Sequence, residues 1–131
     1  ARPASECKKG NDACVEVLYL MRQVRLALGK HKNRLQLVWV VSDRGPVEVD
    51  IQKAYDQENA GFYIIPAPDP KKEAAWQAWL NTQNLGQGIA LIDPSGEKMM
   101  VFPDKTSSND FVKIRKDIER LLKLNRKGEK I

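Results

Sequence analysis

The fold is decided by residues 7–42, which read CKKGNDACVEVLYLMRQVRLALGKHKNRLQLVWVVS. The first part predicts a helix that begins at Asn11 or Asp12, because both side chains are good helix N-caps. Apolar residues then recur at steps of three and four, as one buried face of a helix requires: Cys14, Val17, Leu18, Met21, Val24 and Leu28. Gly29 suits the end of this helix, and the apolar, β-branched residues 35–42 predict a strand buried on both faces.

The rest of the chain continues the alternation of helices and strands. Residues 49–58 have a weak helical pattern, and residues 62–65 form a short apolar run typical of a strand. A helix is expected after Asp69-Pro70, which can cap and begin it. Residues 89–102 predict two strands joined by a turn, and an amphipathic helix follows Ser108. This order indicates an α/β fold with an antiparallel hairpin near its C-terminal end.

A chain of 131 residues is expected to form one domain, with a cysteine loop at residues 1–10 and a frayed basic tail at residues 126–131. Lys and Arg (22) outnumber Asp and Glu (17), which gives a formal net charge of +5. The excess is spread along the chain, so we expect no nucleic-acid partner. No apolar run reaches the roughly 18 residues of a membrane span. The sequence begins at Ala1 without a methionine and is compatible with a membrane anchor upstream.

Cys7 and Cys14 are the candidate functional residues. A cysteine in the first turn of a helix lies near unpaired N–H groups and the positive end of the helix dipole, which both favour its thiolate. Lys8 and Lys9 would have the same effect on Cys7. The spacing leaves several alternatives open: a redox pair, a pair that shares a metal ion, a structural disulfide, or two unpaired thiols.

Other residues that could carry chemistry are expected to have ordinary roles. We expect His31 to be an exposed residue beyond the end of the first helix. Met99 and Met100 should pack or face solvent in the hairpin rather than act as soft metal ligands. Three arginines are expected to be solvated charges rather than a docking surface: Arg22, Arg25 and Arg34. The sequence contains no phosphate loop, zinc signature or Ser/His/Asp grouping.

Two segments carry a family resemblance, the helix at residues 14–25 (CVEVLYLMRQVR) and the turn at residues 90–96 (ALIDPSG). Together with the order of elements, they resemble the Sco-like branch of the thioredoxin superfamily. The resemblance covers the chain from Cys7 to about Leu124. It implies a thioredoxin-like fold, with a mixed central sheet, a C-terminal β-hairpin and flanking helices. It also implies a role in cytochrome oxidase assembly on the periplasmic side of the inner membrane, with an oxidase subunit or a redox partner.

Sco-like proteins are thought to bind copper through a C-x-x-x-C pair and a distant histidine just before the hairpin. Cys14 matches the second cysteine of that pair, and Cys7 lies three residues too far upstream to match the first in register. The place of the histidine falls near Leu85-Gly86, and the lone histidine, His31, follows Cys14 by 17 residues. A helix of that length separates the two by roughly 25 Å. The resemblance therefore implies either Cu(I) held by Cys7 and Cys14 alone, or thiol–disulfide exchange by the same pair.

The sequence also departs from the thioredoxin plan at two places. Thioredoxin-type enzymes use a C-x-x-C pair and place a proline directly before the hairpin, where this chain has Gln87-Gly88. The plan also has a central strand directly before the cysteine loop, which residues 1–6 are too short and too polar to supply. The alternative function is therefore a non-catalytic interaction domain whose two cysteines form a structural disulfide.

Overall fold

The structure is a computed structural model that describes residues 1–7, 12–43, 45–83, 88–103 and 105–129. Its four α-helices are α1 (Asp12–Ala27), α2 (Val49–Tyr55), α3 (Glu73–Gln83) and α4 (Ser108–Glu129). Its four strands are β1 (Leu37–Val40), β2 (Phe62–Ile65), β3 (Ile89–Ile92) and β4 (Lys98–Phe102). Three short 3-10 helices connect them: η1 (Gly29–Arg34), η2 (Glu58–Ala60) and η3 (Pro70–Lys72).

The described strands form two separate sheets of two strands each. β1 and β2 are parallel, with Leu37 opposite Phe62 and Val40 opposite Ile65. β3 and β4 are antiparallel, and their register shifts between Leu91 and Ile92. This arrangement confirms the predicted α/β class and the C-terminal hairpin. The mixed central sheet that was expected is divided into a parallel part and an antiparallel part.

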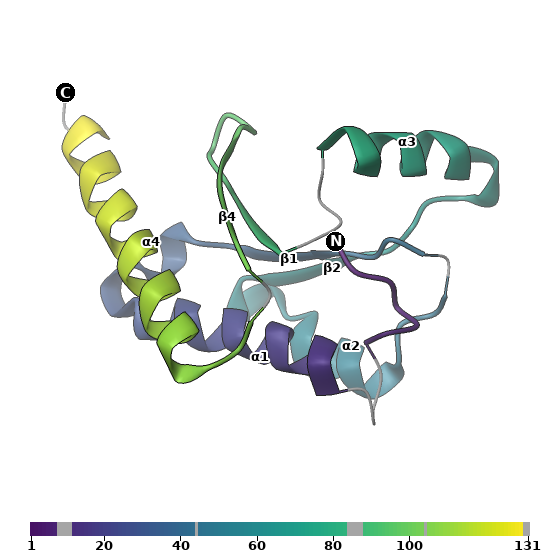
Figure 1. Cartoon of the computed structure of the whole chain (residues 1–131), viewed down its shortest axis with the longest axis horizontal. Helices are drawn as coiled ribbons and strands as arrows, with labels where there is room; N and C mark the ends of the chain where they lie inside the picture. The colour runs from purple at the N-terminus through teal and green to yellow at the C-terminus, as the bar shows by residue number, and fades with distance from the viewer. Residues whose placement is uncertain (8–11, 44, 84–87, 104, 130–131) are drawn as a thin grey trace.

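α1 supports both sheets (Figure 1), because its buried face contributes to two apolar clusters. In the first cluster, Cys14 and Leu18 of α1 pack with β1, β2 and α2. In the second, Leu20 and Val24 of α1 and Leu28 directly after it pack with β4 and α4. Figure 1 shows α1 and α2 on one side of β1 and β2, and α3 on the other side. Removing these side chains from water is the main source of stability for such a fold.

The helix ends follow the predicted capping residues closely. Asp69 caps η3, since its side chain accepts a hydrogen bond from the Lys71 amide, and Pro70 follows at the first position. α4 is capped one residue earlier than predicted, by Ser107. The Asp110 amide donates to the Ser107 hydroxyl oxygen at 3.2 Å, and the Ser107 amide donates to the Asp110 carboxylate at 3.1 Å. This reciprocal pair satisfies two backbone donors at the start of α4.

One prediction about the first strand is wrong, because β1 is buried on one face only. Leu37 and Trp39 face the α1 side and are buried, whereas Val38 is 42% exposed. The apolar sequence of residues 37–41 is typical of a strand covered on both sides. In the described structure, the face of β1 that carries Val38 is left partly open to solvent at this residue.

Two residues predicted to lie at the surface, Arg25 and His31, are buried instead. Arg25 is 7% exposed, and its Nε donates to the Leu35 carbonyl oxygen at 2.8 Å. His31, expected to be exposed, lies in η1 and is 8% exposed. Both corrections have one cause: η1 folds the chain back against the end of α1, so side chains near that turn are enclosed. Arg22 also packs, with its guanidinium 4.7 Å from the ring centre of Tyr55.

Candidate functional site at the Cys7–Cys14 disulfide

Cys7 and Cys14 form a disulfide, with their Cα atoms 5.0 Å apart. Cys14 is the third residue of α1, and Cys7 ends the segment that leads into the chain. Both cysteines are enclosed, with exposures of 0% and 1%. Of the alternatives that the spacing left open, the structure has the oxidised, cross-linked pair.

Residues 1–7 form a strap across the edge of β1, and we call them the N-terminal strap. The Arg2 amide donates to the Val40 carbonyl at 3.0 Å, and the Ser42 amide donates to the Arg2 carbonyl at 3.0 Å. These bonds make a parallel bridge between Arg2 and Val41. The bridge lies on the edge of β1 opposite β2, since Val41 itself donates to Ile65. In the thioredoxin plan a strand directly precedes the cysteine loop. Here the strap pairs at one position, Arg2, along the edge of β1 that faces away from β2.

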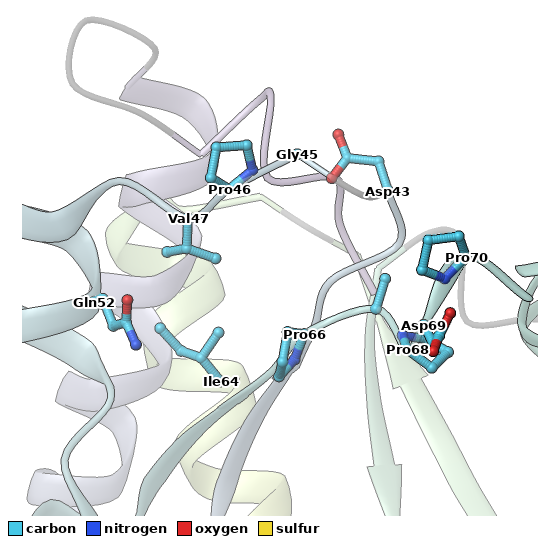
Figure 2. A pocket seen from close by; sticks show the side chains of 11 residues that line it. Asp43, Gly45, Pro46, Val47, Gln52, Ile64, Pro66, Pro68, Asp69 and Pro70 are labelled. Atoms are coloured by element: carbon cyan, nitrogen blue, oxygen red, sulfur yellow. The ribbon is translucent and has the colours of Figure 1, made fainter. Parts of the chain in front are cut away.

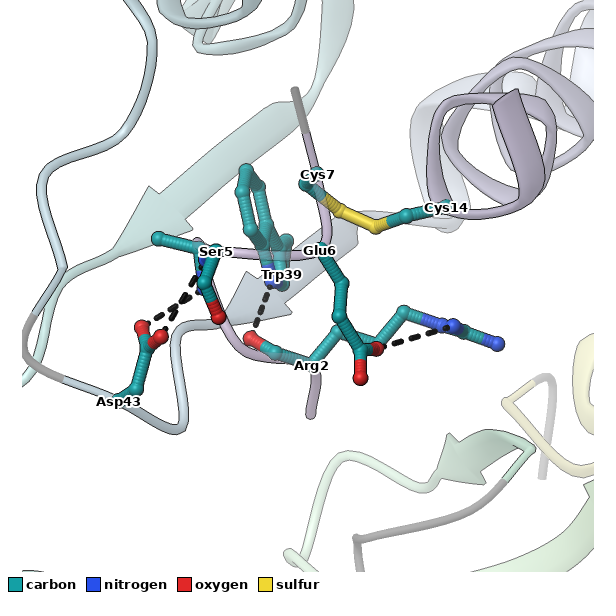
Figure 3. Close-up of polar contacts among 8 residues, drawn as sticks. Arg2, Ser5, Glu6, Cys7, Cys14, Trp39 and Asp43 are labelled. Atoms are coloured by element: carbon teal, nitrogen blue, oxygen red, sulfur yellow. Dashed lines mark hydrogen bonds and ion pairs between the residues drawn. A yellow bond between two sulfur atoms is a disulfide. The ribbon is translucent and has the colours of Figure 1, made fainter. Parts of the chain in front are cut away.

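Trp39 adds a side-chain contact to the same strap residue (Figure 3). Its indole Nε1 donates to the Arg2 carbonyl oxygen at 2.9 Å, while its ring belongs to the apolar cluster that contains the disulfide. The Trp39 side chain is 4% exposed. A buried indole N–H needs such a partner, so this bond fixes the position of Arg2.

Asp43 holds the part of the strap nearest to Cys7. Its carboxylate accepts hydrogen bonds from the Ala4 amide at 2.7 Å and the Ser5 amide at 3.2 Å. Burial alone would raise the pKa of Asp43, but the hydrogen bonds from Ala4, Ser5 and Gly45 outweigh it and lower that pKa. Asp43 therefore carries a negative charge at neutral pH, and the two strap bonds are charge-assisted.

A tight turn connects these bonds to the sulfur. The Cys7 amide donates to the Ala4 carbonyl at 3.1 Å, so the position of Ala4 sets the position of Cys7. Once Ala4 is held by Asp43, Cys7 is held inside the cluster formed by β1, β2 and α1. A reductant in solvent cannot reach a sulfur in this position until the strap moves.

A pocket of about 460 Å³ lies next to the strap, at the carboxyl ends of β1 and β2 (Figure 2). It shares Asp43 with the strap contacts, and a proline-rich segment after β2 forms its opposite wall. The lining residues that matter here are Asp43, Val47, Gln52, Pro66, Pro68 and Asp69. The carboxyl ends of parallel strands are where open α/β sheets commonly bind ligands.

The described residues contain no group of three or more His, Cys, Asp or Glu side chains that could hold a metal ion. His31 lies in η1, after the opposite end of α1 from Cys14, and does not join the cysteines. Met99 is 43% exposed on β4, as predicted for a hairpin residue. The predicted roles of Lys8 and Lys9, and the Leu85-Gly86 position, fall outside the described residues.

Gly88 occupies the position directly before the hairpin, where thioredoxin-type enzymes have proline. Its φ is +76°, and a Cβ there would lie 2.5 Å from the Phe102 carbonyl oxygen. The close approach of the two strands therefore requires glycine at this position.

Sequence reasoning missed the roles of Asp43 and Trp39. By sequence, Asp43 directly follows the predicted strand at residues 35–42 and is expected to end it and cap a turn. A carboxylate directly after a parallel strand is a signal that could have indicated a contact with the neighbouring segment.

Comparison with known proteins gives a family but no individual relative. No curated protein and no solved structure matches the chain. Within the described residues, none of the helices has the length and apolar character needed to cross a membrane. A family described as the transmembrane-like, thioredoxin-like, C-terminal domain matches residues 4–125, which include both cysteines, the strap from Ala4 and all four strands. The chain belongs to this family of thioredoxin-like domains.

Proposed function

We propose that this domain performs thiol–disulfide exchange with a protein client, using Cys7 and Cys14 as its redox pair. The observation that supports this function best is the placement of the two sulfurs. One lies on the first turn of α1 and the other on a separate segment held by hydrogen bonds. The helix start stabilises the thiolate of Cys14 when the pair is reduced.

The client, in this proposal, is a protein of the periplasmic side of the inner membrane, and the wider role is cytochrome oxidase assembly. The support for that narrower role is the resemblance of residues 14–25 and 90–96 to the Sco-like branch. The transmembrane-like description of the matching family fits a membrane-associated setting. We propose the pocket beside Asp43 as the surface that receives an extended segment of the client.

The reduced pair could also bind and transfer Cu(I), as a second function of the same two cysteines. Soft thiolates suit Cu(I), and two thiols whose Cα atoms lie 5.0 Å apart can both reach one ion once the disulfide is reduced. Cys7 and Cys14 would be its two ligands. The disulfide form has no free thiolate, so copper and disulfide exclude each other at this site.

A different function is favoured by one specific observation, the complete burial of both sulfurs. A disulfide with 0% and 1% exposure is also what a structural cross-link would look like. In that case the domain would be a non-catalytic interaction domain, and the disulfide would pin the strap to α1.

A redox titration against glutathione separates these functions. A reversible potential above about −270 mV would support exchange with a client, whereas a potential below about −300 mV would indicate a structural disulfide. Cu(I) competition on the reduced protein should show one site, and Cys7→Ser or Cys14→Ser should each abolish it. If the reduced protein does not bind Cu(I), the copper function is refuted. The redox titration alone then decides whether the pair performs thiol–disulfide exchange.

A further inference from the structure

We propose that the N-terminal strap is a gate over the disulfide, and that Asp43 is the positioning residue that keeps it closed. The gate is residues 1–7, and reduction of the disulfide requires it to lift from β1. The inference rests on the proposed function only where it assigns roles to the two sulfurs. The closed strap itself can be measured without any client.

The strap is attached at three adjacent places, and each is a small set of hydrogen bonds. Arg2 pairs with Val40 and Ser42 on the edge of β1. Trp39 holds the Arg2 carbonyl from the side. Asp43 holds Ala4 and Ser5. Of the described hydrogen bonds that join the strap to the rest of the fold, those of Asp43 lie between the β1 bridge and Cys7, so they control the part of the strap that covers the sulfur.

Besides these hydrogen bonds, the disulfide and the burial of Ala4 and Cys7 hold this part of the strap. Ser5 and Glu6 are exposed, and the described ion pair of Glu6 is with Arg2 of the same strap, at 3.9 Å. Segments with few buried contacts open locally at a lower cost than the core. Ala4 and Cys7 are buried, at 3% and 0% exposure, so opening exposes these two side chains and the cluster residues that they cover.

The geometry also assigns different roles to the two sulfurs. Lifting the strap carries Cys7 towards solvent, while Cys14 stays on α1. The thiolate of a reductant then attacks the Cys7 sulfur, the Cys7–Cys14 bond breaks, and Cys14 leaves as a thiolate at the helix start. A second thiol of the reductant attacks the mixed disulfide and releases Cys7. The reductant is oxidised by two electrons, and the two protein thiolates take up protons from solvent according to their pKa values.

The test compares Asp43→Asn with Asp56→Asn as a matched control. Asp56 also accepts a hydrogen bond from a backbone amide, but its described partner is Ile64, at 3.1 Å, rather than a strap residue. The oxidised proteins are mixed with dithiothreitol, quenched with an alkylating agent and analysed by mass spectrometry. We expect Asp43→Asn to be reduced about tenfold faster than wild type, which corresponds to about 1.4 kcal/mol of easier opening. Asp56→Asn should be reduced at the wild-type rate, and early quenching should trap the mixed disulfide on Cys7.

Amide hydrogen exchange measures the gate without redox chemistry. The amides of Ala4, Ser5 and Cys7 should exchange about tenfold faster in Asp43→Asn, with no change in the amides of α1. Equal rates of reduction in the two variants, or unchanged exchange at these three amides, would overturn the gate. Should Asp43→Asn fail to fold, exchange in wild type still decides the matter. In wild type, the strap amides must then become exchangeable at lower urea concentrations than the amides of α1. The rate of reduction must depend on urea as weakly as the exchange of the strap amides does. A potential below −300 mV alongside faster strap exchange in Asp43→Asn would refute the exchange function and leave the gate standing.

Discussion

Removing the disulfide should lower the stability of the fold by an amount that its loop length sets. The bond closes a loop with a sequence separation of 7, which restricts the unfolded chain by about 2.4 kcal/mol at 25 °C. Because both sulfurs are buried in the apolar cluster, replacing them with alanine adds a packing loss to this entropic effect. The Cys7→Ala/Cys14→Ala double variant should therefore lose at least 2 kcal/mol, which would lower the Tm by roughly 10 °C.

Urea unfolding of three samples separates the two contributions. The oxidised protein, the reduced protein and the double variant are compared at the same pH and temperature. Reduced wild type keeps both sulfur atoms, so its loss of stability reports the cross-link alone, and the further loss in the double variant reports packing. A difference of less than about 0.5 kcal/mol between oxidised and reduced wild type would refute the reasoning, because the bond would then not restrict the unfolded chain.

Three further predictions test the surrounding fold. Gly61→Ala should cost about 1–2 kcal/mol in thermal unfolding from its φ of +63° alone, and more because the new Cβ would lie 2.7 Å from the Arg25 guanidinium; Gly96→Ala, with a φ of +93° and open space around it, controls for the backbone effect. Ser107→Ala removes the cap of α4 and should cost about 1 kcal/mol in urea unfolding. An equal cost in Ser108→Ala would show that the cap was assigned to the wrong residue. The pKa of Asp43 is lower in the folded protein than its ordinary value of 3.8, so its contribution to stability is present above that pH and is lost as the pH falls through the lowered value. Asp43→Asn should accordingly flatten part of the stability loss below pH 4, and an unchanged acid titration would contradict this assignment.

The sequence was sufficient for the local elements because each was marked by signals within a few residues. Two strands joined by a turn were predicted within residues 89–102, which is where β3 and β4 lie. The cap at Asp69 and the glycine at the end of α1 were likewise local signals, with Gly29 at a φ of +57°. The candidate pair was also found from sequence, since both cysteines were visible and one stood at a helix start.

The errors share a different physical origin, which is packing between segments that are distant in sequence. Arg25 looked like a surface charge because its acceptor at Leu35 lies ten residues away, beyond a turn whose path the sequence did not specify. Val38 looked buried because β-branched residues are typical of covered strands, yet no element covers it in the described structure. The role of Asp43 was missed because its partners, Ala4 and Ser5, lie 39 and 38 residues away.

The contact of Asp43 with the strap explains how the spacing of the two cysteines affects their chemistry. In a C-x-x-C pair, both sulfurs belong to one helical turn, so the same local structure sets their acidity and their exposure. Here the separation of 7 places Cys14 on α1 and Cys7 on the strap, and the two properties come under separate control. The helix start sets how well Cys14 leaves as a thiolate, while Asp43 sets how often Cys7 meets solvent. Variants of Asp43 should therefore change the rate of reduction. The reduction potential should shift only to the extent that the variant destabilises the strap differently in the oxidised and reduced forms. A rate and a potential that always move together across such variants would show that one structural element controls both sulfurs.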